Sequence, residues 1–331
     1  MAETRFDVLC IGNAIVDVLA RVEDSFLAKH ALTKGMMRLI DEETAERLYA
    51  DMGPAIEISG GSAGNTAAGI ASFGGRAAYF GKVKNDQLGD VFTHDLRAQG
   101  VSFDSMCANT GPATARSFIL VTPDGERTMN TYLGACVNLT TADIDRAIVA
   151  SSQITYMEGY LWDRPEAKEA FQRAAQIARE AGRKTAITLS DSFCVDRHRD
   201  SFLELIRNQI DIVFANETEI RSLYQTTDFD AAREAARADC EIAVLTRSER
   251  GCVIVRGDDT WTVPAHPIPK LVDATGAGDL FAAGFLHGLT TGRPLDHCAR
   301  LGALAAAEVI THLGARPEVK LAEHARSAGL L

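Results

Sequence analysis

The strongest constraint on the fold is a regular alternation of short apolar runs with longer amphipathic segments. The runs that predict strands are Phe6–Ile11, Lys184–Leu189, Asp211–Phe214, Ile242–Thr246 and Cys252–Val255. Between them, Pro165–Ala181 begins with proline, carries apolar residues three and four apart and is followed by Gly182, which predicts a helix. Such alternation predicts an α/β fold with a mostly parallel sheet covered on both faces. Ligands bind these sheets at the carboxyl ends of the strands.

One region departs from this alternation. Ser117–Val121 and Arg127–Tyr132 predict two strands joined by a turn, because Asp124-Gly125 lies between them. Part of the segment 14–58 also has the pattern of short strands and turns. We expect insertions at about 14–58 and 101–136 to form a small antiparallel sheet that acts as a lid. Without a linker or an internal repeat, residues 1–331 are predicted to form a single domain.

Composition narrows the class of protein. The 331 residues are 46% hydrophobic and 24% charged, as in ordinary globular proteins. The net charge of −11 argues against nucleic acid or an anionic membrane as a partner. Seven cysteines without a CxxC pair argue against a disulfide framework and fit a reducing cytoplasm. The amino-terminal stretch makes a poor signal peptide and no run is long enough to span a membrane, so we expect a cytoplasmic protein.

The segment Asp273-Ala274-Thr275-Gly276-Ala277-Gly278-Asp279 precedes the apolar run 280–289 and carries the clearest sign of chemistry. Its small residues would leave backbone N–H groups free at a helix start, where the helix dipole favours an anion. Asp279 would lie beside that anion, and phosphoryl transfer to a hydroxyl needs such a base next to an oxyanion site. The alternative is a glycine-rich turn that lets a helix pack closely. We expect this loop to lie at the carboxyl end of one of the strands.

A second glycine cluster, Gly60-Gly61-Ser62-Ala63-Gly64-Asn65, precedes an alanine-rich helix start. Small residues allow a ligand to approach the backbone, and Asn65 offers a donor and an acceptor to a polyhydroxyl substrate. Packing of two helices through small residues is an equally good explanation. Asp17 follows the first strand and could accept hydrogen bonds from neighbouring hydroxyls, although for Asp17 taken alone a turn or cap role is the better explanation.

The remaining candidates have similar alternatives. Glu219, in Asn216-Glu217-Thr218-Glu219, could orient metal-bound water, and Asn216 could reach a phosphate, but the spacing also fits a helix capping box. Thr246 and Gly251 could line a nucleotide groove or form a plain turn. Arg127 on the predicted hairpin could close over a phosphate or be an exposed charge.

The sequence lacks the signatures of several enzyme classes. Gly12 is not followed by the further glycines of a dinucleotide fingerprint, and Gly75 to Lys82 lacks the spacing and hydroxyl of a P-loop. No GxSxG elbow is present, and the eight histidines do not form a spaced ligand set.

Taken in order, Asp17, the 60–65 cluster, the 216–219 segment and the 273–279 segment resemble the ribokinase/phosphofructokinase B family of carbohydrate and nucleoside kinases. The resemblance covers nearly the whole chain and implies a three-layer sandwich with a small β-sheet lid. Within the family, the opening segment Gly12–Asp17 and the Ser at position 62 are most similar to the adenosine kinase branch. Ala274-Thr275 and Tyr160 depart from that branch, the latter standing where a Phe stacks on the base.

The resemblance implies a role for each matching position. Asp279 would be the base, the N–H groups of Gly276, Ala277 and Gly278 the anion hole, and Arg127 a phosphate clamp. The substrate would be held by Asn13, Asp17, Gly60, Gly61, Ser62, Asn65 and Tyr160. ATP would contact Asn216, Thr246, Gly251 and Gly278, with Mg²⁺ reached by Glu219 through water.

The expected activity is therefore ATP- and Mg²⁺-dependent phosphorylation of the 5′-hydroxyl of a ribonucleoside, adenosine foremost. The resemblance also implies a monovalent cation such as K⁺ near the 273–279 loop. A sugar kinase and a non-catalytic nucleoside-binding protein are the alternatives, and the chain is expected to work as a monomer or homodimer.

Overall fold

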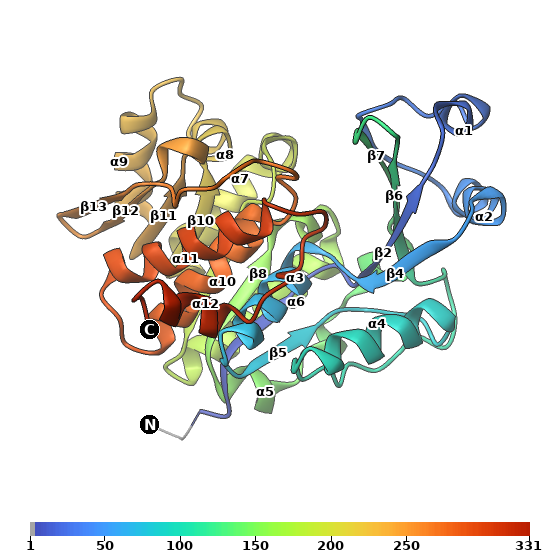
Figure 1. The fold of residues 1–331 in the computed structure, drawn as a ribbon. Helices are drawn as coiled ribbons and strands as arrows, with labels where there is room; N and C mark the ends of the chain where they lie inside the picture. Colours follow the sequence, from blue (N-terminus) through green and yellow to red (C-terminus); the bar gives the residue numbers. More distant parts are fainter. Residues whose placement is uncertain (1–3) are drawn as a thin grey trace.

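The computed structural model describes residues 4–331 and is built around an eight-stranded sheet (Figure 1). Its strands, in spatial order, are β13 (Asp259–Val263), β12 (Cys252–Arg256), β11 (Ile242–Thr246), β10 (Ile212–Asn216), β9 (Lys184–Thr188), β8 (Ser152–Glu158), β1 (Phe6–Ile11) and β5 (Ala77–Phe80). The six strands from β11 to β5 pair in parallel, and β12 and β13 add an antiparallel hairpin at one edge. All five strands predicted from the sequence are present, and the mostly parallel sheet is confirmed.

Helices cover both faces of this sheet. Successive residues of a strand point to opposite faces, so each strand contributes side chains to two separate cores. In β1, Val8 and Cys10 belong to one buried core, and Leu9 and Ile11 to the other. The first core is completed by α3 (Ser62–Ser72), α4 (Gln87–Ala98), α10 (Ala277–Thr290), α11 (Leu295–Val309) and α12 (Leu321–Ser327). The second is completed by α5 (Arg146–Ala150), α6 (Pro165–Glu180), α7 (Ser192–Gln209), α8 (Glu217–Leu223) and α9 (Phe229–Asp239). The three-layer α/β architecture is thereby confirmed.

A smaller five-stranded sheet projects from the central one (Figure 1). Its order is β3 (Met37–Leu39), β7 (Arg127–Tyr132), β6 (Ala115–Val121), β2 (Ile15–Arg21) and β4 (Ala55–Ser59). The predicted hairpin is confirmed: β6 and β7 are antiparallel, and Gly125 adopts the positive φ of 85° that their turn requires. The expectation of a purely antiparallel sheet was wrong, because β2 pairs parallel with β6 and β3 parallel with β7.

The segment 14–58 also contains two helices that the pattern of short strands and turns did not predict, α1 (Asp24–Lys29) and α2 (Glu42–Asp51). Asp41 caps α2 by accepting a hydrogen bond from the backbone N–H of Thr44 at 2.8 Å. At the other predicted insertion, Ser102 forms a β-bridge with Ala78 at the edge of the central sheet. The beginning of the 101–136 segment therefore belongs to the central sheet and not to the smaller one.

The seven cysteines are all free, and five of them are buried. Within residues 4–331, no helix is both long and apolar enough to cross a membrane.

Candidate active site

A cavity of about 740 Å³ lies at the carboxyl ends of the parallel strands, between the central sheet and the smaller sheet. Most residues predicted for the site line it: Asn13, Asp17, Gly61, Ser62, Asn65, Tyr160, Asn216, Glu219, Thr246, Gly276, Ala277, Gly278 and Asp279. Gly60, Arg127 and Gly251 do not. Segments more than 250 residues apart in the sequence therefore meet at one edge of the sheet, as expected for this topology.

Asp279 lies in the first turn of α10 and is held by two side chains from α3. Ser62 Oγ donates to Asp279 Oδ1 at 2.6 Å, and Asn65 Nδ2 donates to Oδ2 at 2.8 Å. Burial raises the pKa of Asp279 above its ordinary value, although these two hydrogen bonds and Arg316 partly offset the effect. The result is an oriented carboxylate with more proton affinity than an exposed aspartate.

Several backbone N–H groups are free at the start of helix α10, next to Asp279. Gly276 is the N-cap of α10 with φ 80°, and within residues 4–331 no acceptor contacts the N–H groups of Gly276, Gly278 or Asp279. The N–H of Ala277 donates weakly to the Ala274 carbonyl at 3.3 Å. This arrangement gives the site an anion-binding helix terminus.

The loop lies at the carboxyl edge of the sheet, as expected, although the strand before it, β13, already ends at Val263. The backbone N–H groups of Val272 and Asp273 donate to the Ile310 carbonyl, which guides the loop to the sheet's carboxyl edge.

The glycine cluster makes room for polar groups. A Cβ on Gly60 would lie 2.3 Å from Asp17 Oδ2, and a Cβ on Gly61, whose φ is 81°, would lie 2.1 Å from the Asn13 carbonyl oxygen. Gly60 therefore does not line the cavity itself. Because it has no side chain, it leaves room for the Asp17 carboxylate, which does. The alternative role also occurs nearby, because a Cβ on Gly69 would lie 2.6 Å from that of Ala283 where α3 packs on α10.

Glu158, at the end of β8, fixes the orientation of Asn13. Its Oε1 accepts from Asn13 Nδ2 at 2.8 Å, and its Oε2 accepts from the backbone N–H of Ala63 at 2.9 Å. Asn13 Oδ1 and Asn65 Oδ1 are buried and have no hydrogen-bond partner among residues 4–331. The amides thus turn their oxygens toward a ligand, and with Asp17 they form a set of acceptors suited to hydroxyl donors.

Asp17, Glu158 and Asp279 lie close enough for their charges to affect one another. Burial raises the pKa of Asp17 to about 7, with Asp279 adding to the rise and Arg316 opposing it. Burial likewise raises the pKa of Glu158 to about 7. Clusters of this kind are typical of functional sites.

On the opposite side of the cavity, Asn216 and Glu219 form the predicted capping box at the start of α8. Glu219 Oε1 accepts from Asn216 Nδ2 at 2.6 Å, and Oε2 accepts from the Asn216 backbone N–H at 2.9 Å. Burial raises the pKa of Glu219 to about 7. Thr246 ends β11 and lines the cavity nearby. Gly251 has φ 78° and forms the tight turn into β12, where a Cβ would lie 2.0 Å from the Val263 carbonyl oxygen.

Arg127 forms an ion pair with Asp273 and so links the smaller sheet to the loop before α10. Asp273 Oδ1 also accepts from Thr275 Oγ1 at 2.8 Å, and its Oδ2 accepts from the Gly314 N–H at 3.0 Å. Nε and Nη2 of Arg127 are buried without a partner. Arg127 is therefore held through Nη1, and its nitrogens Nε and Nη2 remain available as hydrogen-bond donors.

The roof of the cavity is largely apolar. Its apolar residues, from the smaller sheet and its flanking segments, are Ile15, Met37, Leu39, Ile119, Met129 and Leu133. The same sheet also contributes the polar residues Asp17, Arg38, Ser117 and Thr131. Tyr160 adds an aromatic wall, and its phenol oxygen donates to the Ser190 carbonyl at 3.3 Å. Phe193, 74% exposed, lines the same side.

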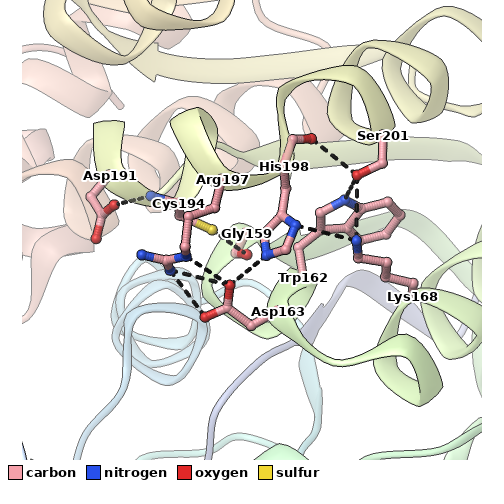
Figure 2. A network of polar contacts seen from close by, with 9 residues as sticks. All are labelled: Gly159, Trp162, Asp163, Lys168, Asp191, Cys194, Arg197, His198 and Ser201. Atoms are coloured by element: carbon pink, nitrogen blue, oxygen red, sulfur yellow. Dashed lines mark hydrogen bonds and ion pairs between the residues drawn. The ribbon is translucent and has the colours of Figure 1, made fainter.

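A polar network braces the wall that carries Tyr160 and Phe193 (Figure 2). Asp163 accepts from Arg197 at 3.0 Å and contacts His198 Nε2 at 2.6 Å, which joins the segment after β8 to helix α7. At the start of α7, Asp191 caps the helix by accepting from the Cys194 N–H at 2.6 Å. The wall is thus a fixed part of the central domain.

Sequence reasoning missed the apolar roof and two buried groups, Glu158 and Arg316. Glu158 had a detectable signal, because a charged residue directly after an apolar strand marks a strand's carboxyl end. The roof is recognisable only once the strands are paired, and Arg316 lies in a loop without any periodic pattern.

The fold and this site define a phosphoryl-transfer enzyme of the three-layer α/β kinase type. The family described as pfkB family carbohydrate kinase matches residues 55–321, and the chain belongs to that family.

Two solved structures are highly similar over their whole length. Adenosine kinase from Sinorhizobium meliloti is 59% identical with a TM-score of 0.90, covering 98% of this chain and 99% of that one. A probable sugar kinase from Rhizobium etli is 57% identical with a TM-score of 0.91, covering 99% of this chain and 100% of that one. Among curated proteins, adenosine kinase from Saccharomyces cerevisiae is 26% identical, covering 93% of this chain and 95% of that protein.

Proposed function

We propose that this protein is an adenosine kinase, which transfers the γ-phosphate of ATP to the 5′-hydroxyl of adenosine. The observation that carries the proposal is the position of Asp279, between a set of hydroxyl acceptors and a helix start with free N–H groups. The 59% identity to the adenosine kinase of Sinorhizobium meliloti supports it.

In the proposed mechanism, Asp279 accepts the proton of the 5′-hydroxyl as that oxygen attacks the γ-phosphate. Ser62 and Asn65 keep the carboxylate in place through their hydrogen bonds at 2.6 and 2.8 Å. The N–H groups of Gly276 and Gly278, at the start of α10, stabilise the charge that develops on the phosphoryl oxygens. Arg127, on the lid, provides further donors to the phosphate when substrates are bound.

The ribose would be held by acceptors from both sheets, since Asp17 belongs to β2 of the smaller sheet, while Asn13 and Asn65 belong to the central domain. Asp17 and the two unpartnered amide oxygens of Asn13 and Asn65 can accept from the 2′- and 3′-hydroxyls. The base would then lie under the apolar roof, with Tyr160 as its aromatic wall. On the other side, ATP would extend along Asn216 and Thr246, with Gly251 shaping the turn beside them.

The residues present fit a magnesium ion at Glu219. Its buried carboxylate faces the cavity and has no cationic partner within residues 4–331, so a divalent cation would offset the cost of its burial. Glu219 would hold the ion through water, which agrees with the preference of Mg²⁺ for retaining its waters. The metal would neutralise charge on the phosphates.

A monovalent cation fits less well. The carboxylate of the 273–279 loop that could bind it, Asp273, already faces the guanidinium of Arg127 and accepts from Thr275 and Gly314. The described residues therefore do not fit a K⁺ ion at Asp273, and no step of the mechanism uses one.

The organisation of the molecule follows from the same proposal. Residues 1–331 would act as one catalytic domain, with the smaller sheet as its lid, in the cytoplasm as a monomer or homodimer. A silent nucleoside-binding protein would not need a base held by two hydrogen bonds beside an anion site.

The competing activity is that of a sugar kinase, which the 57% identity to the probable sugar kinase of Rhizobium etli brings forward. The apolar roof distinguishes the two, because a free sugar has no apolar base to bury. A kinase assay with MgATP and adenosine, inosine, guanosine, cytidine, ribose or fructose tests the proposal. We expect the highest kcat/KM with adenosine. Turnover of ribose or fructose without AMP formation from adenosine would overturn it.

A further inference from the structure

Three consecutive residues of the loop that follows α11 contact the 273–279 loop, the end of β4 and the start of α3. Gly314 donates its N–H to Asp273 at 3.0 Å, and Ala315 lies where a Cβ on Gly276 would fall, 2.8 Å from its own Cβ. Arg316 extends behind the acceptor side of the cavity. This tripeptide therefore contacts the anion loop and the glycine cluster together.

The guanidinium of Arg316 joins the lid strand β4 to helix α3. Its Nη2 donates to the Ser59 carbonyl at 2.7 Å, at the end of β4, and its Nη1 donates to the Gly64 carbonyl in α3. Ser59 Oγ also accepts from Arg316 Nη2 at 3.0 Å, and it donates to Asp95 Oδ2 at 2.6 Å. Gly64 immediately precedes Asn65, which holds Asp279.

The unusual feature is that this cation has no direct carboxylate partner. All the hydrogen bonds it donates within residues 4–331 go to Ser59 and Gly64. Withdrawing an arginine from water without an ion pair costs several kcal/mol, so backbone capping alone is a poor reason for its position. Three carboxylates lie close to its charge. Asp95 accepts from Ser59 Oγ, Asp17 lies where a Cβ on the neighbouring Gly60 would fall, and Asp279 accepts from Asn65, next to Gly64. Asp17 and Asp279 line the cavity, and neither has a direct cationic partner within residues 4–331.

We propose that Arg316 is a positioning residue that keeps Asp17 and Asp279 ionised for catalysis and fixes helix α3 relative to the lid strand β4. The proposal rests on the proposed kinase function, in which both carboxylates act as ions. Arg316 does not line the cavity, so its effect passes through the residues that do. Its field lowers the pKa of Asp17 and of Asp279, in opposition to their burial.

The test compares Arg316→Met, Arg316→Lys and the control Arg326→Met, an exposed arginine of α12. Removing the charge should move the acid limb of the pH profile of kcat/KM to higher pH by about one unit. At pH 7, kcat/KM should fall at least about tenfold. Arg316→Lys keeps the charge and loses the planar fork, so it should restore the wild-type pH profile while kcat stays reduced. The control should match the wild type in both respects.

An unchanged pH profile in Arg316→Met would overturn the proposal, and so would a profile that lysine fails to restore. If the methionine variant does not fold, a shifted acid limb in Arg316→Lys would by itself contradict a role through charge. Each profile is measured with whichever acceptor the wild type phosphorylates best. Failure of the adenosine assignment would therefore appear in the wild type and stay separate from the outcome at Arg316.

Discussion

The floor and the roof of the cavity are built on opposite principles. The floor consists of polar groups at the ends of strands that are buried on both faces, and neighbours fix their orientation, as in the Glu158–Asn13 pair. The roof consists mainly of apolar side chains on a thin sheet, whose edge strand β3 is exposed along its whole length. The difference indicates that the floor supplies fixed geometry for chemistry, and the roof supplies adaptable surface for the rest of the substrate.

The largest expected contrast is in local stability. Amides of β8, in the middle of the central sheet, should exchange with deuterium at least about 10³-fold more slowly than those of β3, because buried strands open only with the whole domain. Native-state hydrogen exchange measures this. Equal protection in the two strands would show that the lid is as rigid as the platform.

A change in the floor should damage chemistry and spare binding. Asp279→Asn should lower kcat by at least about 10²-fold with little change in adenosine affinity, since the amide keeps the size of the side chain and loses the base. Steady-state kinetics and calorimetry separate the two effects. Asp90→Asn, at an exposed position of α4, is the matched control. Near-normal turnover in Asp279→Asn would remove Asp279 from the role of base.

The crowding of carboxylates where the two sheets meet predicts a pH dependence. A carboxylate with a raised pKa is ionised only above that pKa, so activity that needs the ion is lost as the pH falls through it. With the pKa of Asp17 raised to about 7, kcat/KM should decline below about pH 7, by up to about tenfold per unit. A plateau that continues to pH 5 would contradict an essential ionised Asp17.

The ion pair between Arg127 and Asp273 joins the roof to the floor, so its loss should have an intermediate effect. Arg127→Ala should lower kcat about tenfold and change adenosine binding less, because the clamp acts on the phosphate. The comparison is Arg38→Ala, because Arg38 also belongs to the smaller sheet but, unlike Arg127, lines the cavity. A pure increase in KM for adenosine would contradict the clamp.

The smallest effect is expected for the roof itself. Met129→Ser should raise KM for adenosine about three- to tenfold with kcat nearly unchanged, because it removes apolar contact with the base and leaves the floor intact. Kinetics with adenosine and with other nucleosides would show whether base preference changes as well. A large loss of kcat would mean that roof and floor are not separable.

Sequence reasoning was more informative about the floor than about the roof. Strands β1, β9, β10, β11 and β12 and helix α6 carry local sequence patterns that predict them, and Asp279 and Asn65 lie in short glycine-rich segments that can be interpreted residue by residue. The helices α1 and α2 lie in a stretch with many turn residues, so their patterns were masked. The parallel pairing of β2 with β6 depends on contacts about 100 residues apart, which no local pattern encodes.

The tight approach of Gly61 to the Asn13 carbonyl has a consequence for how such enzymes diversify. Any side chain at position 61 would strain the backbone and collide with that carbonyl, so this turn admits essentially one amino acid. Met37 and Leu39 lie on an exposed edge strand where exchange disturbs no core. Descendants of one ancestor could therefore change the molecules they accept by altering the lid while inheriting the phosphoryl-transfer apparatus intact. Laboratory evolution toward new acceptors would best begin at those lid positions.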